Sequence, residues 1–265
     1  MKYLFWNTHK NTDINSILCE LVEENDISIL VLAEYTASID ELIMNLYERG
    51  ISMNKATTFG CERIYVLKNE NLEMQPLLQT DHATIQLIHK SIILCGVHLK
   101  SQIYSDHQKQ REIRVEGIVN DIRKYEQYYN TSNTIIVGDF NINPYDSTCM
   151  DARYFHAIPI YEDAKRKMRK VAGRDFFMFY NPMWNLLGDF NMPLGTYYHN
   201  SGKTINTYWN LYDQVIIRPD LRKCFVNESL KIITATGKTQ LIAKNGHPNK
   251  TISDHLPITF EIKEP

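Results

Sequence analysis

The sequence is poor in cysteine and shows no spacing typical of a metal site or a disulfide framework. Its 265 residues include only five cysteines, an odd number that is widely scattered and contains no CxxC pair. Structural zinc sites and disulfide-stapled domains need closer or paired cysteines. We therefore expect reduced thiols, as in a cytosolic protein.

The sequence also has no long apolar run. The first residues, MKYLFWN, enter a strand-like stretch without the apolar core of a secretory signal peptide. No later segment is apolar over the length needed to cross a bilayer. We expect a cytoplasmic protein without membrane insertion, and nothing in the sequence indicates an obligate protein partner.

Positively and negatively charged residues are also nearly balanced in the sequence. The formal net charge is −2 at pH 7, which excludes a chain that is basic throughout, so any nucleic acid would have to bind a local patch. Hydrophobic residues make up 43% and charged residues 23% of the chain, values typical of a globular α/β protein. Since no repeat or low-complexity linker divides the chain, we expect one domain over residues 1–265.

The most informative stretch is TIIVGDFNINP, residues 134–144. Its β-branched residues predict a buried strand, and Gly138 permits a close approach of another backbone. Asp139 and Asn141 are two positions apart, so they point to the same side, with Phe140 turned into the core. An acid that can take a proton beside an amide suits the handling of a water molecule. An Asx turn after a strand is the alternative interpretation.

Three other apolar strands are predicted to end on a polar residue. Residues 3–6, 27–33 and 92–97 read as strands and are followed by Asn7, Glu34 and His98. Helical periodicity follows the first two, which indicates strands that run in the same direction. Ligands of α/β sheets bind beyond the carboxyl ends of such strands. Four polar strand ends, counting Asp139, therefore favour a functional site over four unrelated caps or turns.

The second half of the sequence reverses this order. Asp213 stands before the apolar run 215–217, and Asp254 and His255 stand before the alternating run 256–262. These polar residues precede their strands, so they can meet the first four only if their strands run antiparallel to the earlier ones. The sequence thus predicts mixed sheets.

The region 151–209 is basic first and aromatic afterwards. A charge run is most often a solvated face and aromatic residues are most often core. Basic and aromatic residues together also suit a groove for phosphates and bases. The basic residues considered as candidates for substrate binding are Lys165, Arg166, Lys167, Arg169, Lys170 and Arg174.

A second copy of the tetrapeptide GDFN occurs at residues 188–191. No β-branched strand precedes it, and Met192-Pro193 follows it. We interpret this copy as a loop and assign Asp189 no role in metal binding.

Six segments together resemble the endonuclease/exonuclease/phosphatase family, the superfamily of deoxyribonuclease I. They span the chain from Asn7 to Ile258 and follow the order of the family. GDFN-x-x-P and SDH-x-P are the specific motifs among them. The segments are WNTHKN, LAEYT, GVHLKS, VGDFNINP, YDQVII and SDHLPI.

The resemblance implies one catalytic domain with a four-layer α/β sandwich, in which two mixed β-sheets pack face to face with helices outside. It also implies a phosphodiesterase or phosphatase that uses Mg²⁺ or Mn²⁺. Abasic-site endonucleases usually carry a tyrosine-containing segment where this chain has VHLKS. That departure favours the deoxyribonuclease, deadenylase or sphingomyelinase side of the family.

The resemblance also implies roles for single residues. By position, Glu34 binds the metal with Asn7 beside it, and Asp254 supports the same region. Asp139 orients or deprotonates the attacking water, and Asn141 positions water and phosphate. His98 would contact a phosphate oxygen, while Asp213 would hold His255 against the scissile phosphate.

Three functions stay open at this point. The leading hypothesis is a nuclease that hydrolyses DNA or RNA. The second is a phosphatase or phosphodiesterase that acts on an inositol or lipid phosphate. The third is a catalytically inactive binding module. The presence of every expected site residue argues against this third function.

Overall fold

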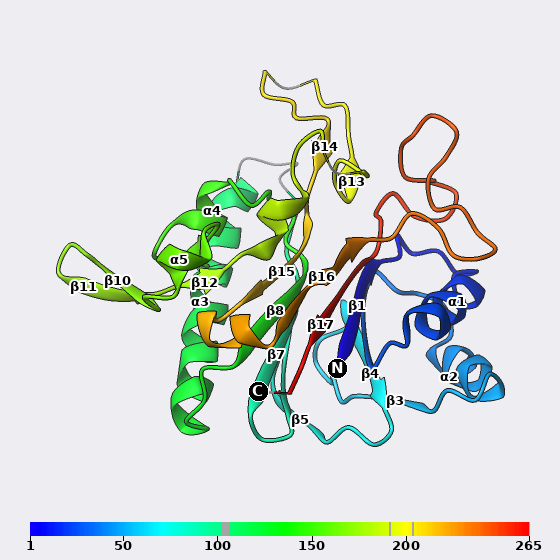
Figure 1. The fold of residues 1–265 in the computed structure, drawn as a ribbon, viewed down its shortest axis with the longest axis horizontal. Helices are drawn as coiled ribbons and strands as arrows, with labels where there is room; N and C mark the ends of the chain where they lie inside the picture. Colours follow the sequence, from blue (N-terminus) through cyan, green and yellow to red (C-terminus); the bar gives the residue numbers. More distant parts are fainter. Residues whose placement is uncertain (102–105, 191, 203, 265) are drawn as a thin grey trace.

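The computed structural model describes residues 1–101, 106–190, 192–202 and 204–264, and two large mixed sheets dominate it (Figure 1). Each sheet contains one parallel pair that matters for the site, β1 with β2 and β7 with β8. The first sheet has six strands in the order β16 (Phe225–Ile232), β17 (Ile258–Ile262), β1 (Lys2–Asn7), β2 (Ile29–Ala33), β4 (Ile64–Asn69) and β3 (Met53–Lys55). The second has seven strands in the order β5 (Met74–Thr80), β6 (Ala83–Ile88), β7 (Ile92–His98), β8 (Thr134–Asp139), β15 (Asp213–Ile217), β12 (Phe179–Tyr180) and β9 (Ala157–Ile158).

Helices cover the outer faces of both sheets. The structure contains α1 (Asn15–Asn25), α2 (Ile39–Glu48), α3 (Asp106–Tyr128), α4 (Ser147–Met150), α5 (Tyr161–Ala164) and the 3₁₀ helices η1 (Pro182–Leu186) and η2 (Pro219–Lys223). Helices α1 and α2 lie beside the first sheet and α3 beside the second (Figure 1). In the part of the chain that the structure describes, no helix is both long enough and apolar enough to span a membrane.

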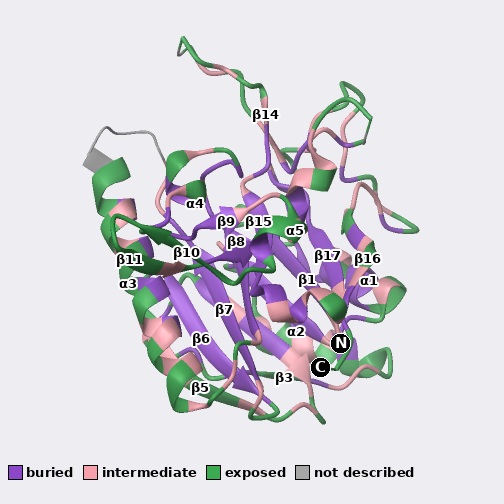
Figure 2. Ribbon diagram, turned by 60° about the vertical axis from the view of Figure 1, so that its left-hand side comes forward, coloured by how far each residue is buried: buried purple, intermediate pink, exposed green. Residues whose placement is uncertain are grey.

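Strand alternation divides the hydrophobic core into three layers. Phe5 and Val31 of the first sheet meet Leu94 and Val137 of the second in the cluster between the sheets. Neighbouring strand positions belong to the clusters under the helices. Figure 2 shows that the central strands of both sheets are buried. One outer cluster includes Trp6 with α1 and α2, and the other lies between the second sheet and α3. The four-layer α/β sandwich implied by the resemblance is therefore confirmed.

The strand directions also follow the prediction. β15 pairs antiparallel with β8, and β17 pairs antiparallel with β1. As a result, the beginnings of the late strands lie beside the ends of the early ones. The mixed sheets inferred from the order of polar and apolar residues are confirmed.

Gly138 allows the close approach of a neighbouring backbone, as predicted from the sequence. A Cβ atom at this residue would lie 1.9 Å from the carbonyl oxygen of Val97 on the neighbouring strand β7. No larger residue fits this spacing without moving a strand. The glycine therefore allows β8 to stay paired with β7 up to Asp139.

The region 151–209 forms small elements, of which β9 and β12 join the edge of the second sheet. It includes two separate two-stranded sheets, β10 (Met168–Val171) with β11 (Arg174–Phe177), and β13 (Tyr197–Tyr198) with β14 (Trp209–Asn210). The described part of the second GDFN copy, residues 188–190, is an exposed turn after η1, which agrees with the loop interpretation. Asn191 of that copy lies outside the described residues.

Candidate active site

The predicted polar residues meet at one edge of the two sheets. In the second sheet, Asp139 at the end of β8 lies in register with His98 at the end of β7 and with Asp213 at the start of β15. Asn7, at the end of β1 in the first sheet, donates a hydrogen bond from Nδ2 to Oδ2 of Asp139 over 3.0 Å. This bond joins the two sheets at the site.

Asp139 is a buried carboxylate with several hydrogen-bond donors. The backbone N–H of Asn141 donates to Oδ1 over 2.9 Å, and the side-chain Nδ2 of Asn141 donates to Oδ2 over 3.0 Å. Burial raises the pKa of Asp139 to about 7, an effect that nearby His255 opposes and the Asp213 carboxylate reinforces. A carboxyl group with a pKa near neutrality can accept a proton during a reaction and release it afterwards.

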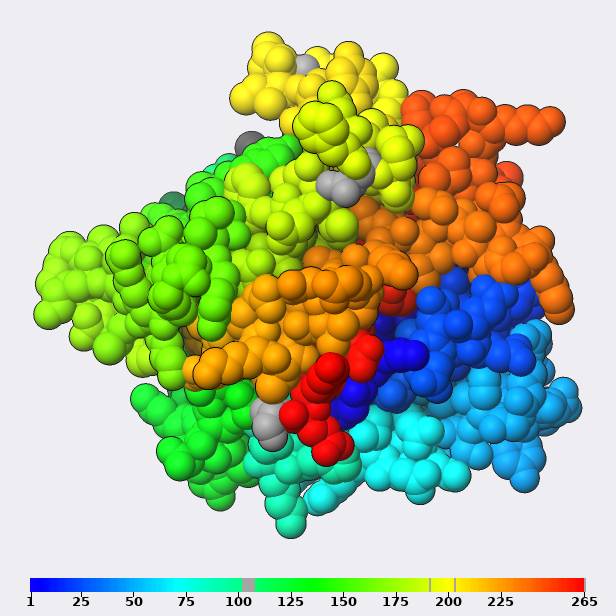
Figure 3. Space-filling view, viewed as in Figure 1, coloured from blue at the N-terminus to red at the C-terminus, as the bar shows by residue number. Residues whose placement is uncertain are grey.

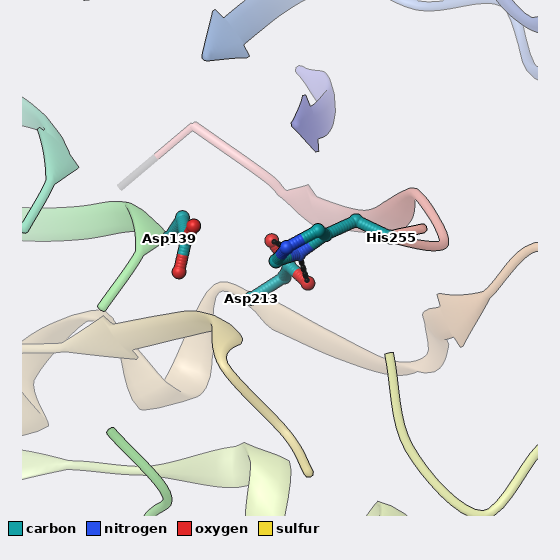
Figure 4. Close-up of side chains that lie close together, drawn as sticks. All are labelled: Asp139, Asp213 and His255. Carbon is teal, nitrogen blue, oxygen red and sulfur yellow. Dashed lines mark hydrogen bonds and ion pairs between the residues drawn. The ribbon is translucent and has the colours of Figure 1, made fainter. Parts of the chain in front are cut away.

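His255 and Asp213 form a buried pair next to Asp139 (Figure 4). The Nδ1 atom of His255 lies 2.8 Å from Oδ2 of Asp213. Burial alone would lower the pKa of His255, but the carboxylates of Asp213 and Asp139 outweigh it and raise the pKa to about 10. The imidazole is therefore held as a cation at neutral pH, with Nε2 left to face a substrate.

His98 and Glu34 occupy the opposite side of Asp139. The Nε2 atom of His98 lies 3.5 Å from Oε1 of Glu34 and 3.8 Å from Oδ2 of Asp139. Burial is the main cause that lowers the pKa of His98 to about 4. His98 is therefore neutral at physiological pH and can donate one hydrogen bond to an oxygen in the site.

Glu34 has an unusual backbone conformation. Its φ is +49°, in the left-handed region that costs a side chain with a Cβ about 1–2 kcal/mol. Asn141, with a φ of +51°, shares this conformation, which asparagine tolerates better. Strained backbone persists where the surrounding structure enforces it, often at functional sites.

The oxygen atoms present suit Mg²⁺ or Mn²⁺, which prefer carboxylate and carbonyl ligands and retain water. Asp139, Asp213 and His255 offer ligand atoms within 4.8 Å of one another. However, Asp213 is already paired with His255, and Asp139 accepts bonds from two asparagines. The half-buried Glu34 carboxylate has Nε2 of His98 at 3.5 Å and could hold a metal ion.

Asp254 lies at the border of the same region. Its Oδ1 atom is 3.1 Å from Nδ1 of His9 and 3.9 Å from Nε2 of His255. This oxygen is buried and receives no well-aligned hydrogen bond in the described part of the chain. An under-used buried oxygen fits the supporting place beside a cation that the resemblance implies.

Tyr197 is a site residue that the sequence analysis did not single out. Its ring lies 4.7 Å from the imidazole of His255, and the two residues form an isolated β-bridge. On its other side the ring stacks on Tyr212, with ring centres 5.4 Å apart. Tyr197 thus shields one face of His255. The aromatic residues of TYYH were the available sequence signal for this site residue. They are far along the chain from every polar strand end, so the sequence did not indicate that they lie at the site.

The basic residues of the region 163–175 do not lie beside the carboxylates. They lie on or next to the β10–β11 hairpin, whose base is closed by a hydrogen bond from the N–H of Met178 to the carbonyl of Lys167. Two residues further on, Tyr180 pairs with Ile217, the end of β15 that is remote from Asp213. The structure therefore places this charge run on a hairpin at the other end of β15 from the carboxylates.

Comparison with known proteins supports the fold but does not identify the substrate or the metal. No protein-family model matches the sequence, and no curated protein matches it. Among solved structures, the chain resembles a 3′-5′ exonuclease, NExo, from Neisseria meningitidis, with 14% identity, a TM-score of 0.62 and full coverage of both chains.

Two other solved structures show the same likeness. One is a truncated Caenorhabditis elegans TDP2, with 15% identity, a TM-score of 0.57 and coverage of 98% of this chain and 96% of that one. The other is an AP endonuclease from Archaeoglobus fulgidus, with 14% identity, a TM-score of 0.55 and full coverage of both chains. These neighbours belong to the endonuclease/exonuclease/phosphatase superfamily, so the resemblance seen in the sequence is confirmed at the level of the fold.

Proposed function

We propose that this protein is a metal-dependent phosphoester hydrolase that cleaves phosphodiester bonds, most specifically those of a nucleic acid. The observation that carries the proposal is the convergence of Glu34, Asp139 and the Asp213–His255 pair at one edge of the two sheets. An oxygen-rich metal site, a carboxyl group with a pKa near 7 and a fixed cation are the groups that hydrolysis of a phosphodiester requires.

Asp139 and Asn141 handle the attacking water in this proposal. Asp139 accepts the water proton, for which its raised pKa is suited. The amide of Asn141 is fixed by bonds to Asp139 and to the carbonyl of Leu99, so its oxygen is aimed in a constant direction. Together they orient the water toward phosphorus without a large rearrangement.

The other side chains stabilise charge on the phosphate. Neutral His98 donates to a phosphate oxygen, and the His255 cation attracts the charge that develops in the transition state. Glu34 would hold a divalent cation with Asn7 and Asp254 near it. When bound, Mg²⁺ or Mn²⁺ supplies further positive charge to the phosphate oxygens.

Several structural neighbours support a nucleic-acid substrate. They include an exonuclease, an AP endonuclease and the endonuclease domain of TRAS1, a telomere-specific retrotransposon, and a second NExo structure contains a bound product DNA hairpin. Those descriptions concern those proteins, and the low identity carries only the fold to this chain. A nucleic acid is the substrate class we propose here, and inositol or lipid phosphates are the alternatives to be tested.

A substrate panel tests this proposal. The purified protein should hydrolyse the small diester bis-p-nitrophenyl phosphate and labelled DNA or RNA with Mg²⁺ or Mn²⁺, and EDTA should stop both reactions. The matched control is Asp139→Asn, prepared in the same way. Hydrolysis of inositol phosphates or lipid headgroups without nucleic-acid cleavage would contradict the nuclease assignment, and no hydrolysis of any ester would indicate a binding module.

A further inference from the structure

The β10–β11 hairpin stands apart from the rest of the protein. It forms its own two-stranded sheet, and every residue from Met168 to Phe177 is exposed except the half-buried Phe176. It projects from the body of the molecule, as the ribbon and the space-filling view both show (Figures 1 and 3). An isolated hairpin of this size is only marginally stable and buries little. Core packing therefore does not explain its composition.

The hairpin and the candidate active site lie at opposite ends of one strand. β15 begins at Asp213 in the site and ends at Ile217, which pairs with Tyr180 just beyond the hairpin. Four steps along a strand cover about 13 Å. A molecule that contacts both places must therefore be extended.

Half of the basic residues in this region are already neutralised. Three of them pair with acids near the hairpin base, namely Lys165 with Glu162, Arg166 with Asp163 and Lys167 with Asp220. Arg169, Lys170 and Arg174 lie on the strands themselves, and no described acid forms an ion pair with them. All three are exposed, but Lys170 lies opposite Asp175 in the strand register, so Arg169 and Arg174 are the cations most available to an external anion.

The strand register sorts the side chains onto two faces. Arg169 lies opposite Phe176 and Val171 lies opposite Arg174, so these four share one face, with the two arginines on a diagonal of about 7–8 Å. The other face holds Phe177, whose ring packs under the guanidinium of Arg123 from α3 at 4.2 Å. The face with two arginines and a phenylalanine is therefore directed away from α3.

We propose that the β10–β11 hairpin is a docking ribbon for double-stranded DNA, remote from the bond that is cleaved. The choice of ligand rests on the proposed function. A two-stranded ribbon fits the major groove of B-DNA, whereas the major groove of double-stranded RNA is too narrow to admit one. The tip residues Ala172 and Gly173 are small and offer no bulky apolar side chain of the kind that anchors a protein in a membrane.

The spacing makes the proposal depend on DNA length. Arg174 lies six residues before Tyr180, which adds at most about 20 Å to the 13 Å of β15, so the span is roughly 13–33 Å, or about 4–10 base pairs at 3.4 Å each. A duplex shorter than this span cannot occupy the active site and the hairpin together. Affinity should therefore increase once the duplex exceeds about ten base pairs.

The proposal is tested by measuring the binding of DNA stem-loops with stems of 4 to 16 base pairs at several salt concentrations. All proteins in this experiment carry Asp139→Asn, so that the DNA is bound but not cleaved. The test variant adds Arg169→Gln, Lys170→Gln and Arg174→Gln. The control variant adds Lys90→Gln, Lys231→Gln and Lys263→Gln, which removes the same charge from exposed positions elsewhere.

We expect the test variant to lose the affinity gained with longer stems and to reduce the slope of log K against log salt by about two to three, since each neutralised phosphate contributes about 0.9. The control variant should keep both. Equal slopes in the two variants would overturn the proposal, and so would binding to anionic phosphatidylserine vesicles in place of DNA. Turnover of bis-p-nitrophenyl phosphate by the unsubstituted protein tests the proposed function separately, because that diester is too small to reach the hairpin.

Discussion

Asp139→Asn is expected to lower kcat for phosphodiester hydrolysis by about 10²–10⁴, the usual range for loss of a general base. The substitution keeps the shape of the side chain, but the amide cannot take a proton, and its NH₂ group cannot accept the hydrogen bonds that one carboxylate oxygen receives from Asn7 or Asn141. Turnover of bis-p-nitrophenyl phosphate under saturating metal measures the effect. Thermal unfolding of the same sample shows whether the fold is retained.

The second GDFN copy provides a matched control within the same chain. Asp189 has the same neighbours in sequence but lies in an exposed turn after a 3₁₀ helix and not at the end of a buried strand. Asp189→Asn should change kcat by less than about tenfold. A folded but inactive Asp189→Asn protein, together with an active Asp139→Asn protein, would show that the wrong copy has been assigned.

His255→Ala is expected to lower kcat by about 10²–10⁴, and Asp213→Ala should add little to that loss. Asp213 acts through His255, because it holds Nδ1 at 2.8 Å and its charge helps to raise the pKa of the imidazole to about 10. Once the imidazole is absent, the carboxylate has nothing left to position. A cycle of the two single variants and the double variant measures this coupling.

Fully additive losses in that cycle would contradict a shared role. Tyr197→Phe provides a comparison, since the ring that covers His255 is retained and only the hydroxyl group is lost. Stability of each variant should be measured without metal, because the buried Asp213–His255 pair also contributes to folding and its loss leaves a buried group without a partner.

The strand-borne part of the site could be predicted from the sequence. A strand places alternate residues on the same side. Asp139 and Asn141 do lie together as predicted, although β8 ends at Asp139 and the contact is the Asx-turn hydrogen bond of the alternative interpretation, from the N–H of Asn141 to Oδ1 of Asp139. The positions of Asp213 and His255 before their strands required antiparallel pairing, which the structure contains. These inferences depend on local periodicity, which remains visible without knowledge of the fold.

The remainder depends on contacts that have no local pattern. The charge run was expected to be either a solvated face or part of a groove for phosphates and bases. It is exposed as the first interpretation requires, but it forms a hairpin turned by Ala172 and Gly173, both with positive φ. Ala-Gly is not among the common signals for such a turn. Tyr197 reaches His255 through a β-bridge between residues 58 positions apart, which no periodicity indicates.

The central claim is that a metal-dependent active site lies at this edge of the sheets. Calorimetric titration with Mg²⁺ or Mn²⁺ tests it most directly, with the metal-free unsubstituted protein compared with the Glu34→Gln variant. Glu34 directly follows a fully buried apolar strand, and its carboxylate has Nε2 of His98 at 3.5 Å. Glutamine has almost the same size but lacks the charge that a divalent cation requires. We expect binding to the unsubstituted protein, at least tenfold weaker binding to Glu34→Gln, and a parallel loss of turnover. Unchanged affinity together with unchanged turnover would contradict a metal-dependent active site at this edge of the sheets.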